Sequence, residues 1–155
     1  MSSARHQGRV AALRALYFWE VGRVEPREAL DTYFAEHDMA ATPAVRAFAE
    51  RLVLGTTDEV LALDALITRA SENWRVERLA VIDRMILRLA AWELQYEPET
   101  PAAVVMDEAL ELARQFSATD SVRFVNGVLD SIRKSLAAVN GAPSANGAPG
   151  LKTPG

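Results

Sequence analysis

The chain has 155 residues, half of them hydrophobic and a quarter charged, and it contains no cysteine. This is the composition of one ordinary globular domain, and it excludes disulfide bonds, thiolate metal sites and a cysteine nucleophile. The formal net charge of −4 argues against non-specific coating of nucleic acid, because neutralising phosphates needs a basic surface. The sequence has neither a bilayer-spanning apolar run nor a secretory signal, which predicts a cytoplasmic protein without membrane partners.

Apolar residues recur at spacings of three and four through the first half of the chain, which predicts amphipathic helices. The first helix is expected over residues 4–22, and a second follows it. The inward face of the first helix comprises Val10, Leu13, Tyr17 and Val21. Thr42 can cap a third helix. Gly55 is expected to break or kink that helix, after which Thr56 and Glu59 have the spacing of a capping box for a fourth.

The second half of the chain predicts three more helices. Residues 78–96 are apolar on most sides, as expected of a central helix, and an internal salt bridge is favoured for Arg88 because an unpaired buried charge is very costly. A sixth helix is expected over residues 102–116, and a seventh follows it. Short loops favour antiparallel packing, so residues 1–138 are predicted to form one all-α domain of about seven helices. Residues 139–155 are rich in Gly, Pro, Ala and Asn, which predicts a disordered tail.

The seventh helix carries Asn126 and Gly127 in its interior, where both residues disfavour a helix. Glycine there costs about 1 kcal/mol relative to alanine. Such a locally unfavourable choice is typical either of close packing or of a functional site. We expect Gly127 to lie on the flank of the apolar face and to admit a neighbouring helix. Asn126 is expected to face the surface and to act in binding, although an ordinary solvated side chain is the alternative.

Three blocks of the sequence resemble the family of the transcription antitermination protein NusB. They are A-L-R-A-L-Y-F-W-E at residues 12–20, W-R-V-E-R-L-A-V-I-D-R-M-I-L-R-L-A-A-W-E-L at residues 74–94, and V-M-D-E-A-L-E-L-A-R-Q-F-S-A-T-D-S-V-R-F-V-N-G-V-L-D at residues 105–130. The last block is the most specific of the three. The resemblance implies that the helices form two small bundles packed together.

The N-terminal segment forms a positive patch on an acidic protein, because no acidic residue precedes Glu20. Arg5 and Arg9 are one helical turn apart, with His6 and Gln7 beside them, and arginine binds phosphate through two parallel hydrogen bonds. The resemblance aligns this segment with a denser arginine-rich run that binds RNA in the NusB family. We expect both arginines to be exposed, so that replacing them weakens RNA binding and leaves thermal stability nearly unchanged.

A second RNA-binding element is expected on the seventh helix, at Arg123, Phe124 and Asn126. This element and the N-terminal patch can form one surface only if the first and seventh helices lie side by side. Two further residues, Trp74 and Asp83, are candidates for binding a protein partner. Their exposure cannot be separated from a structural role by sequence alone.

The sequence predicts binding and no catalysis: no catalytic, metal or cofactor site is expected. The carboxylates of the sixth helix lack the histidines that a helical di-iron site needs. By resemblance, the chain would pair with the ribosomal protein NusE, bind the boxA element of nascent ribosomal RNA and help RNA polymerase pass termination signals. One alternative is a protein-only helical adaptor or homodimer with little RNA binding. Another is the NusB-like module of an RNA methyltransferase, if the chain is a fragment.

Overall fold

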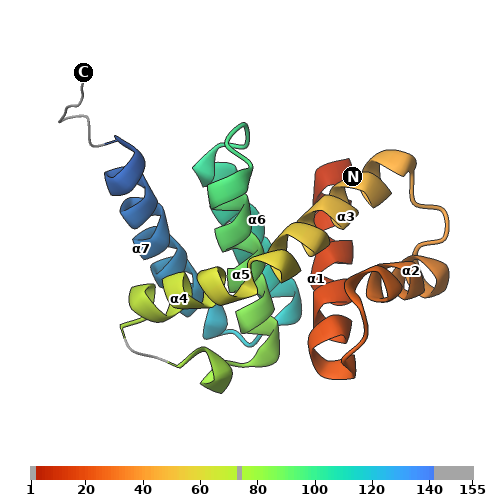
Figure 1. The fold of residues 1–155 in the computed structure, drawn as a ribbon, viewed down its shortest axis with the longest axis horizontal. Helices are drawn as coiled ribbons and strands as arrows, with labels where there is room; N and C mark the ends of the chain where they lie inside the picture. The colour runs from red at the N-terminus through yellow and green to blue at the C-terminus, as the bar shows by residue number, and fades with distance from the viewer. Residues whose placement is uncertain (1–2, 73–74, 142–155) are drawn as a thin grey trace.

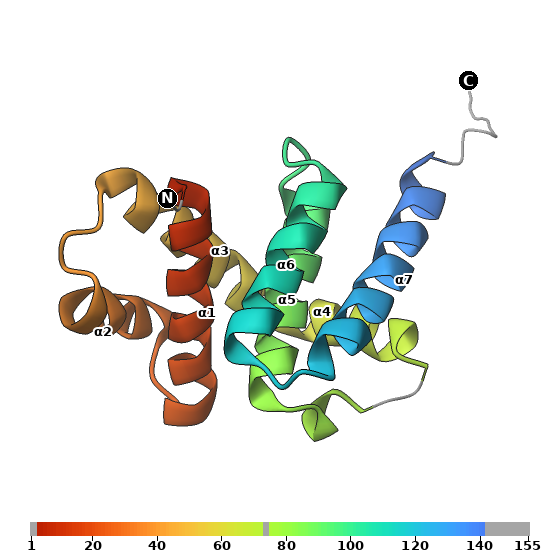
Figure 2. The same ribbon diagram turned by 180° about the vertical axis from the view of Figure 1, so that it is seen from behind.

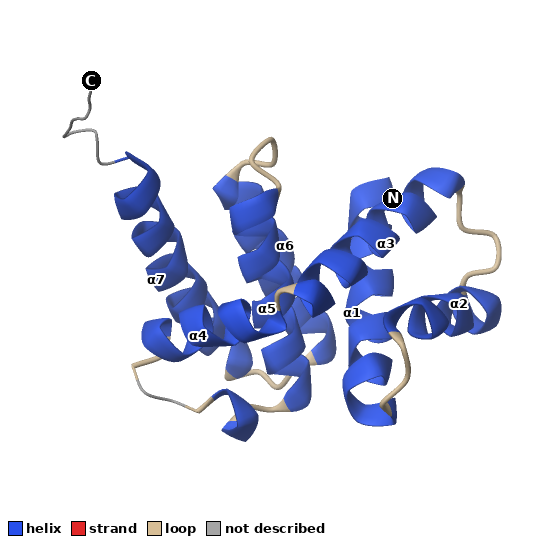
Figure 3. Cartoon of the chain, in the orientation of Figure 1, coloured by secondary structure: helices blue, strands red, loops and turns tan. Residues whose placement is uncertain are grey.

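The computed structural model describes residues 3–72 and 75–141, and the regular structure in these ranges is entirely helical (Figures 1 and 3). The elements are α1 Ala4–Gly22, α2 Pro26–His37, α3 Pro43–Asp58, α4 Val60–Ala70, the 3₁₀ helix η1 Val76–Arg78, α5 Val81–Tyr96, α6 Ala102–Phe116 and α7 Ser121–Gly141. The predicted all-α class with seven α-helices is confirmed for the described part of the chain. None of these helices is long and apolar enough to cross a lipid bilayer.

The helices form two bundles that share one hydrophobic core (Figure 2). In the first bundle α1 packs on α2 and α3, and in the second α5 packs on α4, α6 and α7. The bundles meet where α1 and α3 contact α5. Every residue from Met85 to Glu93 is buried, so α5 is the central helix that the sequence predicts. Helix α1 runs alongside α5: Arg5 near the start of α1 lies 4.0 Å from Glu97 at the end of α5, and Glu20 near the end of α1 lies 3.4 Å from Arg84 near the start of α5.

Two arginines of α5 form ion pairs with other helices. Arg88 donates from Nε to Asp64 Oδ1 at 2.7 Å and from Nη2 to Asp64 Oδ2 at 2.8 Å, and Glu20 of α1 accepts from Nη1 at 3.3 Å. Arg84 lies 3.4 Å from the same Glu20 carboxylate. The internal salt bridge expected for Arg88 is therefore confirmed. Its partners come from α1 and α4, which sequence spacing did not identify.

The junction between α3 and α4 differs from the prediction. Helix α3 continues through Gly55, because the Trp92 indole of α5 lies where a side chain would stand: a Cβ on Gly55 would be 2.2 Å from Trp92 Cζ2. Thr56 is buried inside α3, and Glu59 makes no side-chain capping hydrogen bond at the start of α4. The predicted break and capping box are wrong. Glycine at this position serves helix packing.

The end of the last helix also differs from the prediction. Helix α7 runs to Gly141, so residues 139–141 belong to the helix, whereas the sequence placed them in the tail. Residues 142–155, where the tail was expected, lie outside the described part of the chain.

The packing role expected for Gly127 is wrong. Gly127 is exposed, and a Cβ built on it would meet no heavy atom within 4 Å. The reason is the helical repeat: at roughly 100° per residue, Gly127 lies about 200° from the fully buried Val125, on the outer face of α7. Within the described structure, no other helix packs against Gly127.

Replacing Gly127 with alanine is therefore expected to stabilise the protein by up to about 1 kcal/mol, because alanine has the higher helix propensity and nothing obstructs its methyl group. Urea unfolding followed by circular dichroism measures the change. A loss of stability would mean that the outer face of α7 is covered by something outside the described residues.

Candidate nucleic-acid interface

The N-terminal half of α1 faces the second bundle and is largely neutralised by it. Arg9 is only 3% exposed. It donates from Nε to Glu93 Oε2 at 2.9 Å and from Nη2 to Glu93 Oε1 at 2.8 Å, while Glu108 lies 3.5 Å from Nη1. Arg9 is thus an internal ion pair between α1, α5 and α6. The expectation that it is an exposed phosphate ligand is wrong, since its bidentate fork already holds a carboxylate.

The electrostatics of Arg9 reflect this pairing. Burial by itself lowers the pKa of Arg9, but the hydrogen bonds and charges of Glu93 and Glu108 outweigh burial and raise the pKa above its ordinary value. The guanidinium is therefore charged at neutral pH. Its loss would leave the Glu93 carboxylate, which is only 2% exposed, without its cation.

The other N-terminal residues remain at the surface. Arg5 lies over the Phe48 ring at 4.4 Å and 4.0 Å from Glu97, with half of its side chain exposed. His6 Nδ1 lies 2.9 Å from Glu108 Oε1, and Gln7 is exposed. Acidic residues of the second bundle thus face the whole patch, which makes it less positive than the sequence suggests.

The structure does not bring the two predicted RNA-binding elements together. Helices α5 and α6 lie between α1 and α7 in both views (Figures 1 and 2). Arg5 and His6 meet the end of α5 and the first half of α6, whereas Arg123 and Phe124 lie in the first turn of α7, beyond the opposite end of α6. The single surface that would join them is therefore absent from the described residues.

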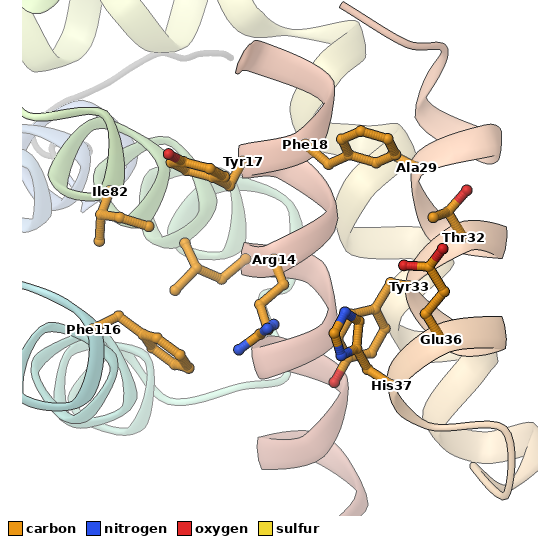
Figure 4. A pocket seen from close by; sticks show the side chains of 11 residues that line it. Arg14, Tyr17, Phe18, Ala29, Thr32, Tyr33, Glu36, His37, Ile82 and Phe116 are labelled. Atoms are coloured by element: carbon orange, nitrogen blue, oxygen red, sulfur yellow. The ribbon is translucent and has the colours of Figure 1, made fainter. Parts of the chain in front are cut away.

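The C-terminal half of α1 lines an aromatic groove that the sequence did not predict. The groove spans both bundles, with walls from α1, α2, the start of α5 and the end of α6, and has a volume of about 380 Å³. Its lining residues are Leu13, Arg14, Tyr17, Phe18, Ala29, Thr32, Tyr33, Glu36, His37, Ile82 and Phe116 (Figure 4). Tyr17 was expected to face the core, but it is 42% exposed because it lies at the gap between the bundles.

Aromatic rings and one arginine are arranged around the aromatic groove. Tyr33 and His37 are stacked, with ring centroids 5.5 Å apart and planes at 28°. The Arg14 guanidinium carbon lies 5.9 Å from the ring centroids of both Tyr33 and Phe116, so one cation connects the walls from the two bundles (Figure 4). Burial and the charge of Asp38 raise the pKa of Tyr33, with a smaller opposing effect from Arg14, so its hydroxyl remains protonated at neutral pH.

Asp83 performs a structural task at the neighbouring surface. It is buried, and its two carboxylate oxygens accept hydrogen bonds from Ser117 Oγ at 2.5 Å and Ser121 Oγ at 2.7 Å. These bonds hold the start of α5 against the connection between α6 and α7. Of the two roles that the sequence left open for Asp83, exposure for a partner or a structural task, the structure shows the structural one. Trp74, the other candidate for partner binding, lies outside the described residues.

A second groove of about 280 Å³ adjoins Asp83. Its lining residues are Arg78, Leu79, Ala80, Asp83, Asp120, Ser121 and Phe124. Because Ile82 lines the aromatic groove and Asp83 lines this one, the two grooves flank the start of α5. Arg123 is exposed beside Phe124. Of the three residues predicted on α7, only Phe124 lines this second groove.

Asn126 lies elsewhere. It is exposed and lines a separate groove between α6 and α7, roughly 200° around α7 from Phe124. Phe124 and Asn126 thus belong to two different surfaces. The helical repeat predicts this separation, because residues two positions apart lie on different sides of a helix.

The structure is thus an all-helical protein of two bundles, with a groove of aromatic rings and one arginine across their junction. The NusB family model matches residues 6–134. The transcription antitermination protein NusB of Sorangium cellulosum is 44% identical over 137 residues, covering 88% of this chain and 96% of the relative. The chain belongs to the NusB family.

Solved structures agree with this assignment. The structure of T. maritima NusB superposes with a TM-score of 0.79 at 35% sequence identity, covering 86% of this chain and 93% of that one. A chain from the crystal structure of antitermination factors NusB and NusE in complex with double-stranded RNA shares the fold, with a TM-score of 0.80 at 24% identity over 87% of this chain and 99% of that one.

Proposed function

We propose that this protein is a transcription antitermination factor that binds boxA-type single-stranded RNA together with ribosomal protein NusE and acts on the elongating RNA polymerase. The aromatic groove is the observation that carries the proposal. Specific recognition of RNA usually targets unstacked bases, which stack on aromatic rings or on arginine planes. Tyr17, Tyr33 and Phe116 supply rings, and Arg14 supplies a cation among them.

The charge distribution explains why a partner is needed. The protein has a net charge of −4, and the arginines of its N-terminal patch face glutamates of its own second bundle. Few cations of this patch therefore remain for phosphates, so the patch alone should hold RNA weakly and with a shallow salt dependence. A partner that adds surface to the same RNA converts two weak contacts into one tight complex.

One solved structure supports a complex with both partners. A chain of the same fold has been crystallised with NusE and RNA. For the present protein we place NusE beside the groove at Asp83 and Phe124, which adjoins the aromatic groove, so that one RNA strand could contact both proteins. Arg5, His6, Gln7 and Arg123 are proposed as peripheral RNA contacts. The function needs no chemistry beyond binding, and a protein acting on transcription is placed in the cytoplasm.

Replacing Tyr17 with leucine is expected to weaken boxA RNA binding at least about fivefold, because it removes a stacking surface and keeps an apolar side chain of similar size. Fluorescence anisotropy with labelled boxA RNA, with and without NusE, measures the affinity. Tyr96→Leu is the matched control, since Tyr96 is similarly exposed at the end of α5 and lies outside the groove.

A second pair of variants tests whether Arg14 contacts the RNA. Arg14→Gln should lower the salt dependence of binding by roughly 0.7 in slope, the loss of one contact to single-stranded RNA, whereas Arg27→Gln on the exposed face of α2 should leave it unchanged. Equal RNA affinities for the Tyr17 and Tyr96 variants would move the RNA site away from the aromatic groove. The absence of RNA binding even with NusE would refute the proposed function itself.

A further inference from the structure

A single carboxylate joins the start of α5 to the connection between α6 and α7. Asp83 Oδ1 accepts a hydrogen bond from Ser117 Oγ at 2.5 Å, and Asp83 Oδ2 accepts one from Ser121 Oγ at 2.7 Å. Ser117 follows the last residue of α6, and Ser121 is the first residue of α7. The two oxygens of Asp83 therefore hold both ends of the connection. These three residues are called the Asp83 clamp below.

The burial of Asp83 makes the clamp firm. Asp83 is only 8% exposed, so its carboxylate depends on the two serine hydroxyls in place of water. Hydrogen bonds to an ionised carboxylate are stronger than those between neutral groups. A buried carboxylate that loses its donors is costly, because neither water nor another group replaces them. The hydroxyls of Ser117 and Ser121 are therefore held in place, and so is the chain to which they belong.

Each residue of the Asp83 clamp is close in the chain to a residue that lines a groove. Ile82 precedes Asp83, and Phe116 precedes the first serine of the clamp. Both line the aromatic groove, on the same side of it (Figure 4). Phe124, which lines the second groove, lies one helical turn after the second serine and on the same side of α7. One carboxylate thus fixes walls of the two grooves relative to each other.

We propose that Asp83 is a positioning residue for both binding surfaces, and that it sets the spacing between the aromatic groove and the second groove. The inference rests on the proposed function, in which RNA binds the aromatic groove and NusE lies beside the second one. One RNA strand can contact both proteins only if these surfaces are in register, and a clamp that holds them in advance lowers the ordering cost of binding. Asp83 acts through the serines and not by contact with either partner, since both of its oxygens are occupied.

Removing either hydroxyl of the Asp83 clamp tests the inference. Ser117→Ala and Ser121→Ala are each expected to weaken two affinities by about threefold or more, because each lets the walls of both grooves move before binding. The first affinity is for labelled boxA RNA without NusE, measured by fluorescence anisotropy at low salt, where it is strongest. The second is for NusE without RNA, measured by calorimetry. Ser117→Thr and Ser121→Thr keep the hydroxyl and should restore both affinities. Ser135→Ala is the matched control, since Ser135 is exposed near the end of α7.

The pattern across the two partners decides between positioning and other roles. Loss of RNA binding alone in Ser117→Ala, with loss of NusE binding alone in Ser121→Ala, overturns the proposal, because each serine then acts locally. A lower melting temperature with both affinities unchanged also overturns it and leaves the clamp a structural element. Loss of NusE binding in Asp83→Asn, with both alanine variants normal, would assign Asp83 to direct contact with NusE. An unmodified chain that binds no RNA even with NusE refutes the proposed function, and this inference with it.

Discussion

Replacing Arg9 with methionine is expected to lower the free energy of unfolding by about 3–5 kcal/mol, the cost of breaking a buried ion pair from one side. Methionine keeps much of the side-chain volume but leaves Glu93 buried beside Glu108 without the cation that both face. Urea unfolding monitored by circular dichroism measures the loss. This expectation reverses the one drawn from sequence, in which Arg9 was an exposed residue of little importance to stability.

Two variants separate the ion pair from general effects at the N-terminus. Arg5→Met, one turn earlier and half exposed, should change stability by less than about 1 kcal/mol, as is usual for surface pairs. Arg9→Met combined with Glu93→Leu should recover most of the lost stability, because removing both charges leaves no buried group unpaired. A small effect of Arg9→Met alone would show that water reaches Glu93 and that the bundles are not held together at this point.

Replacing Gly55 with alanine is expected to destabilise the protein at the upper end of about 1–3 kcal/mol, the usual range for overpacking. The added methyl group would stand 2.2 Å from Trp92 Cζ2 and 2.3 Å from Cε2, and a rigid indole cannot yield as a flexible side chain would. Helix propensity acts in the opposite direction by about 1 kcal/mol, so the measured loss understates the clash. Chemical unfolding of the variant provides the value.

A second substitution, at Trp92, tests whether contact with this side chain causes the loss of stability. Gly55→Ala combined with Trp92→Leu should be less destabilised than the sum of the two single changes, since each relieves the other, and a double-mutant cycle measures this coupling. Gly127→Ala is the internal reference, with the same chemical change at an open helical position and the opposite expected sign. Stabilisation by Gly55→Ala would mean that α3 and α5 are further apart than the structure shows.

Arg9, Arg88 and Gly55 together have a consequence for function. Arg9 ties α1 to α5 and α6, Arg88 ties α5 to α4 and α1, and Gly55 lets α3 lie against α5. All of these contacts lie on or beside the junction of the two bundles. The aromatic groove takes walls from both bundles, so its shape depends on that junction. Variants that loosen the junction are expected to weaken RNA binding without touching the groove.

Much of the fold follows from the sequence. The bounds predicted for the first and sixth helices are those observed, Ala4–Gly22 and Ala102–Phe116, and the central position of α5 follows from its broad apolar surface. The internal pairing of Arg88 also follows, because a charge on such a helix needs a partner. These features are encoded locally, in residues a few positions apart, and the resemblance to the NusB family extended them to two bundles.

The environment of individual side chains was decided by tertiary structure alone. Arg9 and Arg14 look alike in the sequence, yet the second bundle buries Arg9 against Glu93 and leaves Arg14 among aromatic rings. Gly55 and Gly127 both lie within helices, yet only Gly55 meets a neighbour. Periodicity determines which face of a helix is apolar, because that depends on local backbone geometry. It cannot determine what the other bundle places against that face, because those contacts join residues as many as 102 positions apart.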